Sequence, residues 1–555
     1  MADAFRSRAI AARLVVEGDL VLVTPAHLGN GDAESITAMP LLLDPVDQQP
    51  LLTGTSLAGA LRGYLASYER GYGLAERDPT TLAVQLFGSL KGDDQGEQSP
   101  LIVDDAYGSL PSTRLFEVRD GVKIDGATRT ADEKKKYDLE LLPAGTCFPL
   151  RLELLLPAAE EPARRLRQAL ALALQGLMAD APHDAGAIAL GARRSRGFGR
   201  CRVAQWRYTF YDLHDPSGLV AWVTANAYDL RDPPGQVASG TASHAPWGVP
   251  PTARWHGGAN AIFGPEAALP SAPLPDARRR FQIHATFDLA SPILIRTTDP
   301  LALTGEQPDA EQPDVAHLRS YRPDDPRPQH EAPVIPGTSL AGVLRARATR
   351  IVHTLHWPPS AQANALLDAM FGNDMHRERP KGVTEPPQPT ASRLIVEETP
   401  ITKGAFLVQN RVAIDRFTGG AYDTALFAEA PHVGGDIALR LTLRLDALQG
   451  SAARQQAQHQ AQHAQIGLLL LLLKDLWTSD LPLGGTSSIG RGRLAGRAAT
   501  LTADDGRIWE LTAIGAEPAA RLTGLKLEQV AGHGKKKAHE GLETYVNALR
   551  TYLEA

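Results

Sequence analysis

The chain has little cysteine, no long hydrophobic segment and no excess of positive charge. Only Cys147 and Cys201 occur among 555 residues, which excludes a disulfide framework and a zinc site built from several cysteines, and which suits a reducing cytoplasm. The N-terminus has no apolar run long enough for a signal peptide, and the most apolar segment, residues 466–477, is too short to span a bilayer. We therefore expect a cytoplasmic protein that does not insert into a membrane, with a buried helix at residues 466–477.

The charge and composition limit the partners that the chain can bind. A formal net charge of −6 argues against a surface coated with positive charge, so any nucleic-acid site must be a local groove. The apolar fraction of 43% and the charged fraction of 22% are ordinary for a globular protein. A length of 555 residues exceeds one hydrophobic core and predicts about two to four domains.

A nine-residue stretch occurs twice. GTSLAGALR runs from Gly54 to Arg62, and GTSLAGVLR runs from Gly337 to Arg345, so the two copies differ at one position. A Gly-Thr-Ser sequence followed by leucines at helical spacing predicts a loop that turns into a capped helix, with Leu57 and Leu61 facing a core. The repetition makes an internal duplication the first hypothesis for the whole chain.

Such a helix start is also suited to bind an anion. Its backbone N–H groups are unpaired, the helix dipole is positive there, and a nearby guanidinium would add positive charge. A plain capped amphipathic helix remains the alternative. The residues that this hypothesis assigns to phosphate binding are Thr55, Ser56 and Arg62 in the first copy and Thr338, Ser339 and Arg345 in the second.

The remaining sequence features occur twice in the same order. Each half offers an opening strand, a long polar loop, the duplicated helix start, an extended hairpin, an Ala/Leu/Gln-rich helix and a Gly/Arg-rich loop. The hairpins begin at Ile124 and Ile414. We predict a first domain at residues 1–211, a linker or irregular insertion at 212–278, a second domain at 279–515 and a C-terminal helical extension at 516–555.

The Gly/Arg-rich loops are candidates for contacts with a sugar-phosphate backbone. Alternating glycine and arginine gives a basic, flexible loop, and Phe198 in the first loop could stack on a base or pack inside. An arginine-rich structural turn is the alternative. The candidate residues are Arg193, Arg194, Arg196, Arg200 and Arg202 in the first loop, and Arg491 and Arg493 in the second.

Taken together, these features resemble the RAMP superfamily, specifically the backbone subunit of type III CRISPR effector complexes. Two copies in one chain are similar to the double backbone subunit of type III-D systems. The resemblance implies an α+β protein with two tandem ferredoxin-like (RRM-like) palms, each carrying a projecting thumb hairpin. It also implies crRNA, target RNA and other type III effector subunits as partners.

The resemblance gives the hairpins a role. In the family the thumbs wedge between nucleotides and splay the guide–target duplex, which implies RNA contacts at Ile124, Ile414 and Phe417. An ordinary β-hairpin packed on its own domain is the alternative.

The resemblance also implies a cleavage site on the loop between the first strand and the duplicated helix. The family pattern there is Asp, three residues, an aliphatic residue and Arg, and the sequence DVAHLR from Asp314 to Arg319 matches it. Asp314 is therefore the candidate catalytic aspartate, with Mg²⁺ or Mn²⁺ as cofactor and Asp314 as a metal ligand. A solvated loop acid is the alternative. His317 is a weaker candidate for an acid or base.

The first half departs from this pattern. The same register places Ala38 where the carboxylate should be. Either the first half binds RNA without cutting it, or Asp32 or Asp44 substitutes from a shifted loop.

The leading hypothesis is a crRNA-binding backbone subunit that is also a metal-dependent endoribonuclease acting on target RNA. Three alternatives remain: a non-catalytic RNA-binding scaffold, a guide-processing RAMP endoribonuclease that works without metal, and an interaction protein that binds no RNA.

Overall fold

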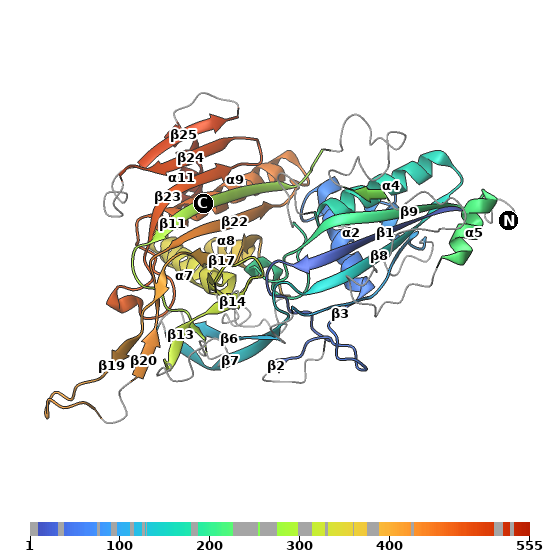
Figure 1. Ribbon diagram of the computed structural model, residues 1–555. Coiled ribbons are helices and arrows are strands. Elements are labelled where there is room, and N and C mark those ends of the chain that lie inside the picture. Colours follow the sequence, from blue (N-terminus) through green and yellow to red (C-terminus); the bar gives the residue numbers. More distant parts are fainter. Residues whose placement is uncertain are drawn as a thin grey trace, which may run out of the picture. The chain divides into compact units, whose positions relative to one another are not determined.

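The protein divides into two compact units. Unit 1 consists of Met1–Glu117, Leu139–Arg194 and Phe198–Arg278, and unit 2 consists of Val118–Asp138, Ser195–Gly197 and Arg279–Ala555. The structure is a computed structural model (Figure 1). It describes residues 9–31, 38–74, 78–89, 97–111, 116–124, 128, 130–178, 187–225, 253–255, 275–297, 313–327, 331–358, 360–373, 388–422, 427–515, 525–532 and 538–555.

Unit 1 is built on a five-stranded antiparallel sheet. The strand order across it is β10-β9-β1-β8-β4. The elements of this unit are β1 (Ile10–Leu22), β2 (Ala38–Met39), β3 (Leu51–Leu52), α2 (Gly54–Arg70), α3 (Leu82–Phe87), β4 (Leu101–Val103), β5 (Ala106–Tyr107), β8 (Cys147–Pro157), α4 (Glu160–Gln175), β9 (Cys201–Asp212), α5 (Pro216–Thr224) and β10 (Ala253–Trp255).

The alternation of β1 decides which face of this sheet is covered. Leu14, Val16 and Leu20 share one face of the strand because side chains alternate at period two. They join a buried core with Leu57 and Leu61 of α2. Burying each such leucine contributes about 1.5–3 kcal/mol. The predicted opening strand and the predicted helix face are both confirmed.

Unit 2 holds the larger sheet, with the order β14-β15-β17-β22-β11-β23-β24-β25 and β16 paired to β22. Its elements begin with most of β6 (Glu117–Ile124) and β7 (Ala131–Leu141), which form a hairpin. The others are β11 (Arg279–Leu289), β12 (Arg296–Thr297), β13 (Val315–His317), β14 (Arg319–Tyr321), β15 (Glu331–Ile335), α7 (Gly337–Leu355), α8 (Ala361–Phe371), β16 (Leu394–Val396), β17 (Thr399–Thr402), β18 (Ala405–Phe406), β19 (Gln409–Arg411), β20 (Phe427–Ala430), β21 (His432–Val433), β22 (Asp436–Leu445), α9 (Ala452–Trp477), β23 (Leu494–Thr502), β24 (Ile508–Ala513), β25 (Leu525–Ala531) and α11 (Ala538–Glu554).

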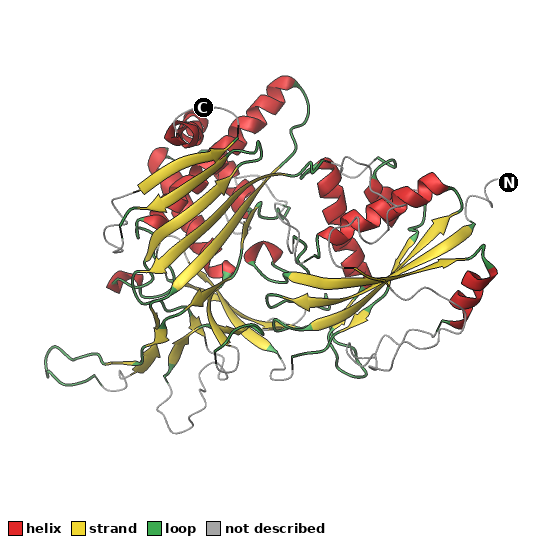
Figure 2. Ribbon diagram, turned by 45° about the horizontal axis from the view of Figure 1, so that its top comes forward, coloured by secondary structure: helices red, strands yellow, loops and turns green. Residues whose placement is uncertain are grey.

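The two units share one arrangement of elements. In unit 1 the chain order β1, α2, β4, β8, α4, β9 gives the strand order β9-β1-β8-β4. In unit 2 the order β11, α7, β16, β22, α9, β23 gives β23-β11-β22-β16. In each unit the long helices lie on one side of the sheet (Figure 2). The sequence repeat is therefore a structural repeat of mixed α+β class.

The C-terminal segment adds to the sheet of unit 2 as well as to its helices. Residues 516–555 are predicted to be helical, yet Leu525–Ala531 forms β25, paired with β24. The alternation LKLEQVA explains the strand. Helix α11 then packs on α9 at Gly467, where an added Cβ would lie 2.2 Å from the Tyr545 carbonyl oxygen.

The predicted linker at residues 212–278 contributes α5 and β10 to unit 1, and most of it lies outside the described residues. The segment 466–477 forms the buried second half of α9, as predicted. None of the helices within the described ranges has the length and hydropathy that crossing a bilayer requires.

Candidate nucleic-acid interface

Asp314 lies just before β13 in unit 2. It lies beside β20, the returning strand of a projecting hairpin that β19 and β20 form. Its Oδ2 atom accepts a hydrogen bond of 2.7 Å from the backbone N–H of Ala428. The two residues that follow it, Val315 and Ala316, pair in parallel with β20. The Asp314 side chain is exposed. Its carboxylate is thus fixed through one oxygen at the root of the hairpin and faces solvent.

This setting limits the kind of metal site that Asp314 could form. Within the described residues, no group of three or more His, Cys, Asp or Glu side chains is placed to hold a metal ion. Magnesium is often held by only one or two carboxylates, with water and substrate phosphate oxygens completing its shell. Asp314 Oδ1 has no bonding partner among the described residues. The residues present therefore fit a metal shared with an RNA phosphate and do not fit an all-protein cage.

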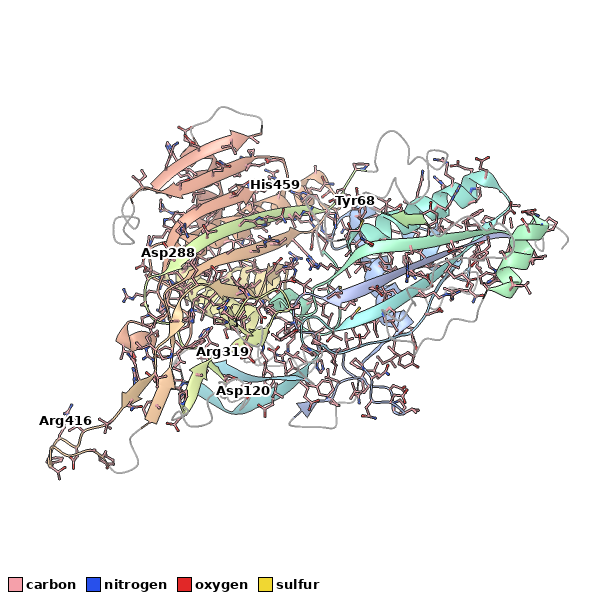
Figure 3. The ribbon with its side chains drawn as sticks, viewed as in Figure 1. Tyr68, Asp120, Asp288, Arg319, Arg416 and His459 are labelled. Atoms are coloured by element: carbon pink, nitrogen blue, oxygen red, sulfur yellow. The ribbon has the colours of Figure 1, made fainter. Side chains whose placement is uncertain are left out.

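The hairpin tip is a turn closed by its own hydrogen bonds. Asp415 Oδ1 accepts a bond of 2.9 Å from the Phe417 N–H, and Asp415 Oδ2 accepts one of 3.1 Å from the Thr418 hydroxyl. The Gly419 N–H donates to the Asp415 carbonyl at 2.9 Å. The turn presents the Phe417 ring, which is 99% exposed. Figure 3 shows the neighbouring Arg416 at the far end of the hairpin, away from Arg319 in the body of unit 2.

Apolar side chains extend along the hairpin below Phe417. Exposed apolar side chains that gather on one element mark an interaction site more often than isolated ones do. On this hairpin Val412 is 46% exposed, Ile414 65% and Tyr422 62%. In the first repeat Ile124, at the end of β6, is 53% exposed. The structure thus brings the predicted wedge residues of each hairpin to its surface.

A buried ion cluster holds the root of the second hairpin. Glu429 is fully buried in β20 and is bonded by Arg491 and, at 2.7 Å, by Arg411 of β19. Arg491 also donates to Gln409 Oε1 at 2.9 Å and is only 5% exposed. Arg491 was predicted to contact RNA, but its guanidinium is used inside the protein because it compensates a buried carboxylate. The Gly/Arg loop that carries Arg491 therefore braces the hairpin.

Replacing Arg491 with methionine is expected to loosen the hairpin root by about 1–3 kcal/mol, because Glu429 loses the buried one of its two arginine partners. Hydrogen exchange at residues 409–411 and 427–430 measures this loss. The matched control is Arg493→Met in the same loop, where the side chain is exposed and an effect within about 0.5 kcal/mol is expected. Equal exchange in the two variants would contradict a bracing role for Arg491.

In the first Gly/Arg loop, Arg196 makes structural bonds within unit 2. Its guanidinium donates to the Phe371 carbonyl at the end of α8, at 3.0 Å, and to the Ser392 hydroxyl at 3.4 Å. Gly197 follows with φ +88°, and an added Cβ would lie 2.3 Å from the Glu398 nitrogen. Arg196 is therefore an anchor of this loop, and its predicted RNA contact has no support from its geometry.

The other loop arginines differ in exposure. Arg194, Arg202 and Arg493 are exposed, whereas Arg193 and Arg200 are half-buried. Phe198 is 2% exposed and packs with Leu139 and Leu141, so it packs inside and does not present its ring to a base. That the exposed arginines contact phosphate stays a prediction.

The two helix starts differ in how their backbone donors are used. At α2, the Thr53 side chain accepts from the Ser56 N–H, and Asp105 Oδ1 accepts from the Gly54 N–H at 2.6 Å. At α7 the N-cap residue is Pro336 and no side chain caps the helix. A carboxylate already lies at the first helix start, where it would repel a phosphate. Thr55 and Ser56 are exposed there, and Thr338 and Ser339 are half-buried at the second.

The duplicated arginines do not converge on these helix starts. Arg62 lies eight residues after Gly54, which is about 12 Å along a helix. Its guanidinium donates to the Gly88 carbonyl at 3.0 Å. Arg345 lies 3.8 Å from Asp368 of α8. Both arginines therefore fasten the helix to its neighbour, and the predicted combination of helix start and guanidinium is not assembled.

The first half offers no described counterpart of Asp314. Ala38 lies in β2, and Asp32 lies outside the described residues. Asp44 is 5% exposed and accepts from the Val46 N–H at 3.2 Å, inside its own turn. Its burial separates it from solvent and from any bound RNA. That the first half binds without cutting stays a prediction.

His317 does not suit the acid or base role considered from the sequence. The side chain is fully buried in β13. Burial lowers the pKa of His317 to about 3, with a smaller contribution from His432 in the same direction. The ring is therefore neutral and is shielded from solvent.

A family model identifies both repeats. The model of the RAMP superfamily matches residues 19–202 and residues 286–495, one range in each repeat and together more than half of the chain. The chain belongs to the RAMP superfamily. No match was found among curated proteins.

Sequence reasoning missed a second buried ion cluster in this RAMP chain. Glu398 is buried in unit 2, and both Arg119 of β6 and Arg322 bond its carboxylate. Arg119 Nη2 lies 3.2 Å from Glu398 Oε1. Arg119 and Glu398 are 279 residues apart, so no local spacing signals the pair. The one available signal is the pair of acids, Glu397 and Glu398, that follows the apolar run LIV of β16.

The first repeat has an acid at the position equivalent to Glu398. Glu398 corresponds to Asp105, since LIVEE and LIVDD occupy equivalent strands β16 and β4. In the first RAMP unit the acid caps α2, whereas in the second it binds two arginines and leaves α7 without a side-chain cap. The equivalent acid therefore bonds the start of a helix in one repeat and anchors β6 in the other.

Proposed function

We propose that this RAMP protein is a backbone subunit of a type III CRISPR effector complex that binds crRNA and cleaves complementary target RNA in its second repeat. Each repeat would be a ferredoxin-like palm with a thumb hairpin, as in a type III-D-like double subunit. The β-α-β-β-α-β order and the matching strand neighbours in both units support the palms. The family match to both repeats supports the RNA and CRISPR context.

The observation that carries the proposal is the bond between Asp314 and the hairpin. The carboxylate is fixed at the root of a hairpin whose tip presents an exposed phenyl ring. An aromatic or apolar wedge unstacks a nucleic-acid step and kinks the backbone. Because Asp314 and Phe417 belong to one hairpin assembly, the distorted nucleotide and the carboxylate would meet at a defined distance.

The chemistry follows from the kinked backbone. The 2′-hydroxyl of the unstacked nucleotide attacks the adjacent phosphorus in line, the P–O5′ bond breaks, and the leaving oxygen takes a proton from solvent. Asp314 Oδ1 would accept the 2′-hydroxyl proton, or would serve as a ligand of a bound metal. Bound Mg²⁺ or Mn²⁺ would supply charge stabilisation of the phosphate oxygens. The exposed Arg194, Arg202 and Arg493 are suited to contact the sugar-phosphate backbone, which a local groove requires in a chain of net charge −6.

The complex would work in the cytoplasm with crRNA, target RNA and other type III effector subunits. Two rival functions make different predictions. A non-catalytic scaffold would bind the same RNA without cutting it. A guide-processing RAMP endoribonuclease would cut precursor RNA without added metal.

The wedge is tested by replacing Phe417 with alanine. In a complex of the full chain with guide RNA, a target carrying 2-aminopurine at successive positions should fluoresce strongly where the wild-type hairpin unstacks a base. We expect Phe417→Ala to quench that position and to weaken target binding by about 1–3 kcal/mol, the scale of one base–aromatic contact.

The matched control is Trp357→Ala, because Trp357 is a 76% exposed aromatic residue outside the hairpin. It should leave both the fluorescence pattern and the affinity unchanged. A wild-type complex that shows no unstacked position, or a Phe417→Ala variant that keeps it, would refute the wedge. Absence of any RNA from the purified chain, and of RNA binding, would refute the proposed function as a whole.

A further inference from the structure

Two buried histidines lie directly behind Asp314. His317 ends β13, three residues after Asp314, and His432 begins β21, just after the strand that bonds Asp314. Both side chains are buried, at 0% and 1% exposure. Their ring centroids are 6.1 Å apart. The pair therefore bridges the segment of Asp314 and the returning foot of the hairpin.

The hydrogen bonds fix the tautomer of each ring. The Ile295 N–H donates to His317 Nδ1 at 3.1 Å, so the proton of neutral His317 lies on Nε2. His432 Nε2 lies 3.1 Å from the Lys403 carbonyl, an acceptor, so His432 carries its proton on Nε2 and has a bare Nδ1. Within the described residues, His317 Nε2 and His432 Nδ1 are buried without a hydrogen-bond partner. His317 Nε2 is thus an unpaired donor, and His432 Nδ1 is an unpaired acceptor.

Burial keeps both rings neutral, because it lowers the pKa of His317 to about 3 and also lowers the pKa of His432. The charged groups around them, Arg319 and Arg327, act in the same direction. The Val334 backbone opposes this shift at His317, although its contact with the ring does not reach the geometry of a hydrogen bond. A buried donor and a buried acceptor without partners are costly, and a water molecule with two to four polar neighbours commonly satisfies such groups.

The pair also continues into the other foot of the hairpin. The Phe406 ring of β18 meets the His432 ring edge to face, with centroids 5.1 Å apart. The Arg319 guanidinium lies 3.9 Å from the centre of the Phe406 ring. Since β18 pairs with β21, the stack joins the residues that follow Asp314, namely His317 and Arg319, to the two strands β18 and β21 that flank the hairpin.

We propose that His317 and His432, joined through one internal water, are positioning residues that hold Asp314 in register with the hairpin. This inference rests on the proposed cleavage function, in which Asp314 is the reacting group. Neither histidine touches RNA. Their role is to keep the β13 segment from shifting relative to the hairpin when a guide–target duplex binds to the hairpin.

The test uses three variants of the full chain. His317→Phe fills the site without an N–H, His317→Gln places an amide N–H near the position of Nε2, and His459→Gln is a control at an exposed histidine of α9. We expect His317→Phe to lower the single-turnover cleavage rate about 10- to 100-fold, the usual effect of losing a residue that orients a reacting group. Guide and target affinities should stay within about twofold, His317→Gln should recover most of the rate, and the control should match wild type.

Two measurements separate this inference from the cleavage function itself. Nitrogen-15 NMR of histidine-labelled protein should show His317 and His432 neutral at pH 7, each protonated on Nε2, and hydrogen exchange at residues 313–318 should rise in His317→Phe. Both can be read even if the wild-type complex cuts no RNA, an outcome that would remove the catalytic role while the pair itself is still tested. A charged ring or a different tautomer, or a folded His317→Phe protein with wild-type exchange and cleavage, would overturn the inference.

Discussion

Replacing Asp314 with asparagine is expected to slow target RNA cleavage by about 10²–10⁴-fold without changing guide binding. Asparagine keeps the size of the side chain, and its carbonyl oxygen can still accept from the Ala428 N–H. The amide cannot take up the 2′-hydroxyl proton at neutral pH, and it lacks the charge that holds a divalent cation. The change therefore removes the chemistry while the hairpin root stays in place.

The measurement is single-turnover cleavage of an end-labelled target by the assembled complex, with saturating Mg²⁺. Glu510→Gln is the matched control, because Glu510 is an exposed acid on β24 of the same unit. It should cleave at the wild-type rate. Undiminished cleavage by Asp314→Asn would rule out Asp314, and a wild-type complex that binds but never cuts would favour the scaffold. Cutting of precursor RNA without metal would instead indicate a guide-processing enzyme.

The sequence predicts the repeated fold because its signals are local. Alternation in β1 and leucine spacing in α2 depend on neighbouring residues, and each was borne out by a buried face. The turn at Asp415 is also local, since one carboxylate bonds residues two and three positions on. The exposure of Phe417 follows from that turn.

The roles of the arginines were not predictable in this way. A Gly/Arg-rich loop has the same sequence pattern whether its guanidinium groups face solvent or a buried acid. Arg491 is committed to Glu429, which lies 62 residues earlier, and Arg196 to a helix end 175 residues later. Only the tertiary fold brings such partners together, so exposed Arg493 and buried Arg491 are indistinguishable beforehand.

The largest expected effect on stability comes from Glu398. Its side chain is fully buried between Arg119 and Arg322, whose own side chains are 5% and 13% exposed. Removing one member of a buried ion cluster leaves the others desolvated and uncompensated, at a cost of about 3–5 kcal/mol. We expect Glu398→Gln to destabilise unit 2 by this amount and to raise hydrogen exchange along residues 118–124, because Arg119 is the buried anchor of β6.

An apolar replacement of the whole cluster distinguishes charge compensation from packing. The triple change Arg119→Met, Glu398→Leu and Arg322→Met removes all three charges at similar volume, and such replacements of buried ion clusters are often neutral or stabilising. We expect it to recover most of the stability that Glu398→Gln loses, as measured by thermal unfolding. A triple variant as unstable as Glu398→Gln would mean that the specific hydrogen bonds of the cluster matter more than its charge balance.

The pH dependence of the unfolding free energy tests the same ion cluster independently. Burial alone would raise the pKa of Glu398, but the adjoining Arg119 and Arg322 outweigh it and hold that pKa below its ordinary value of 4.5. A lowered pKa means that the unfolded chain binds this proton more readily than the folded protein does, so the contribution to stability is complete above about pH 4.5 and is lost as the pH falls further. Wild type should therefore lose stability below that pH more steeply than the triple variant, which carries no carboxyl group at this position. Identical acid profiles would contradict an ionised Glu398 in the folded protein, and with it the view that a charged anchor secures β6 in unit 2.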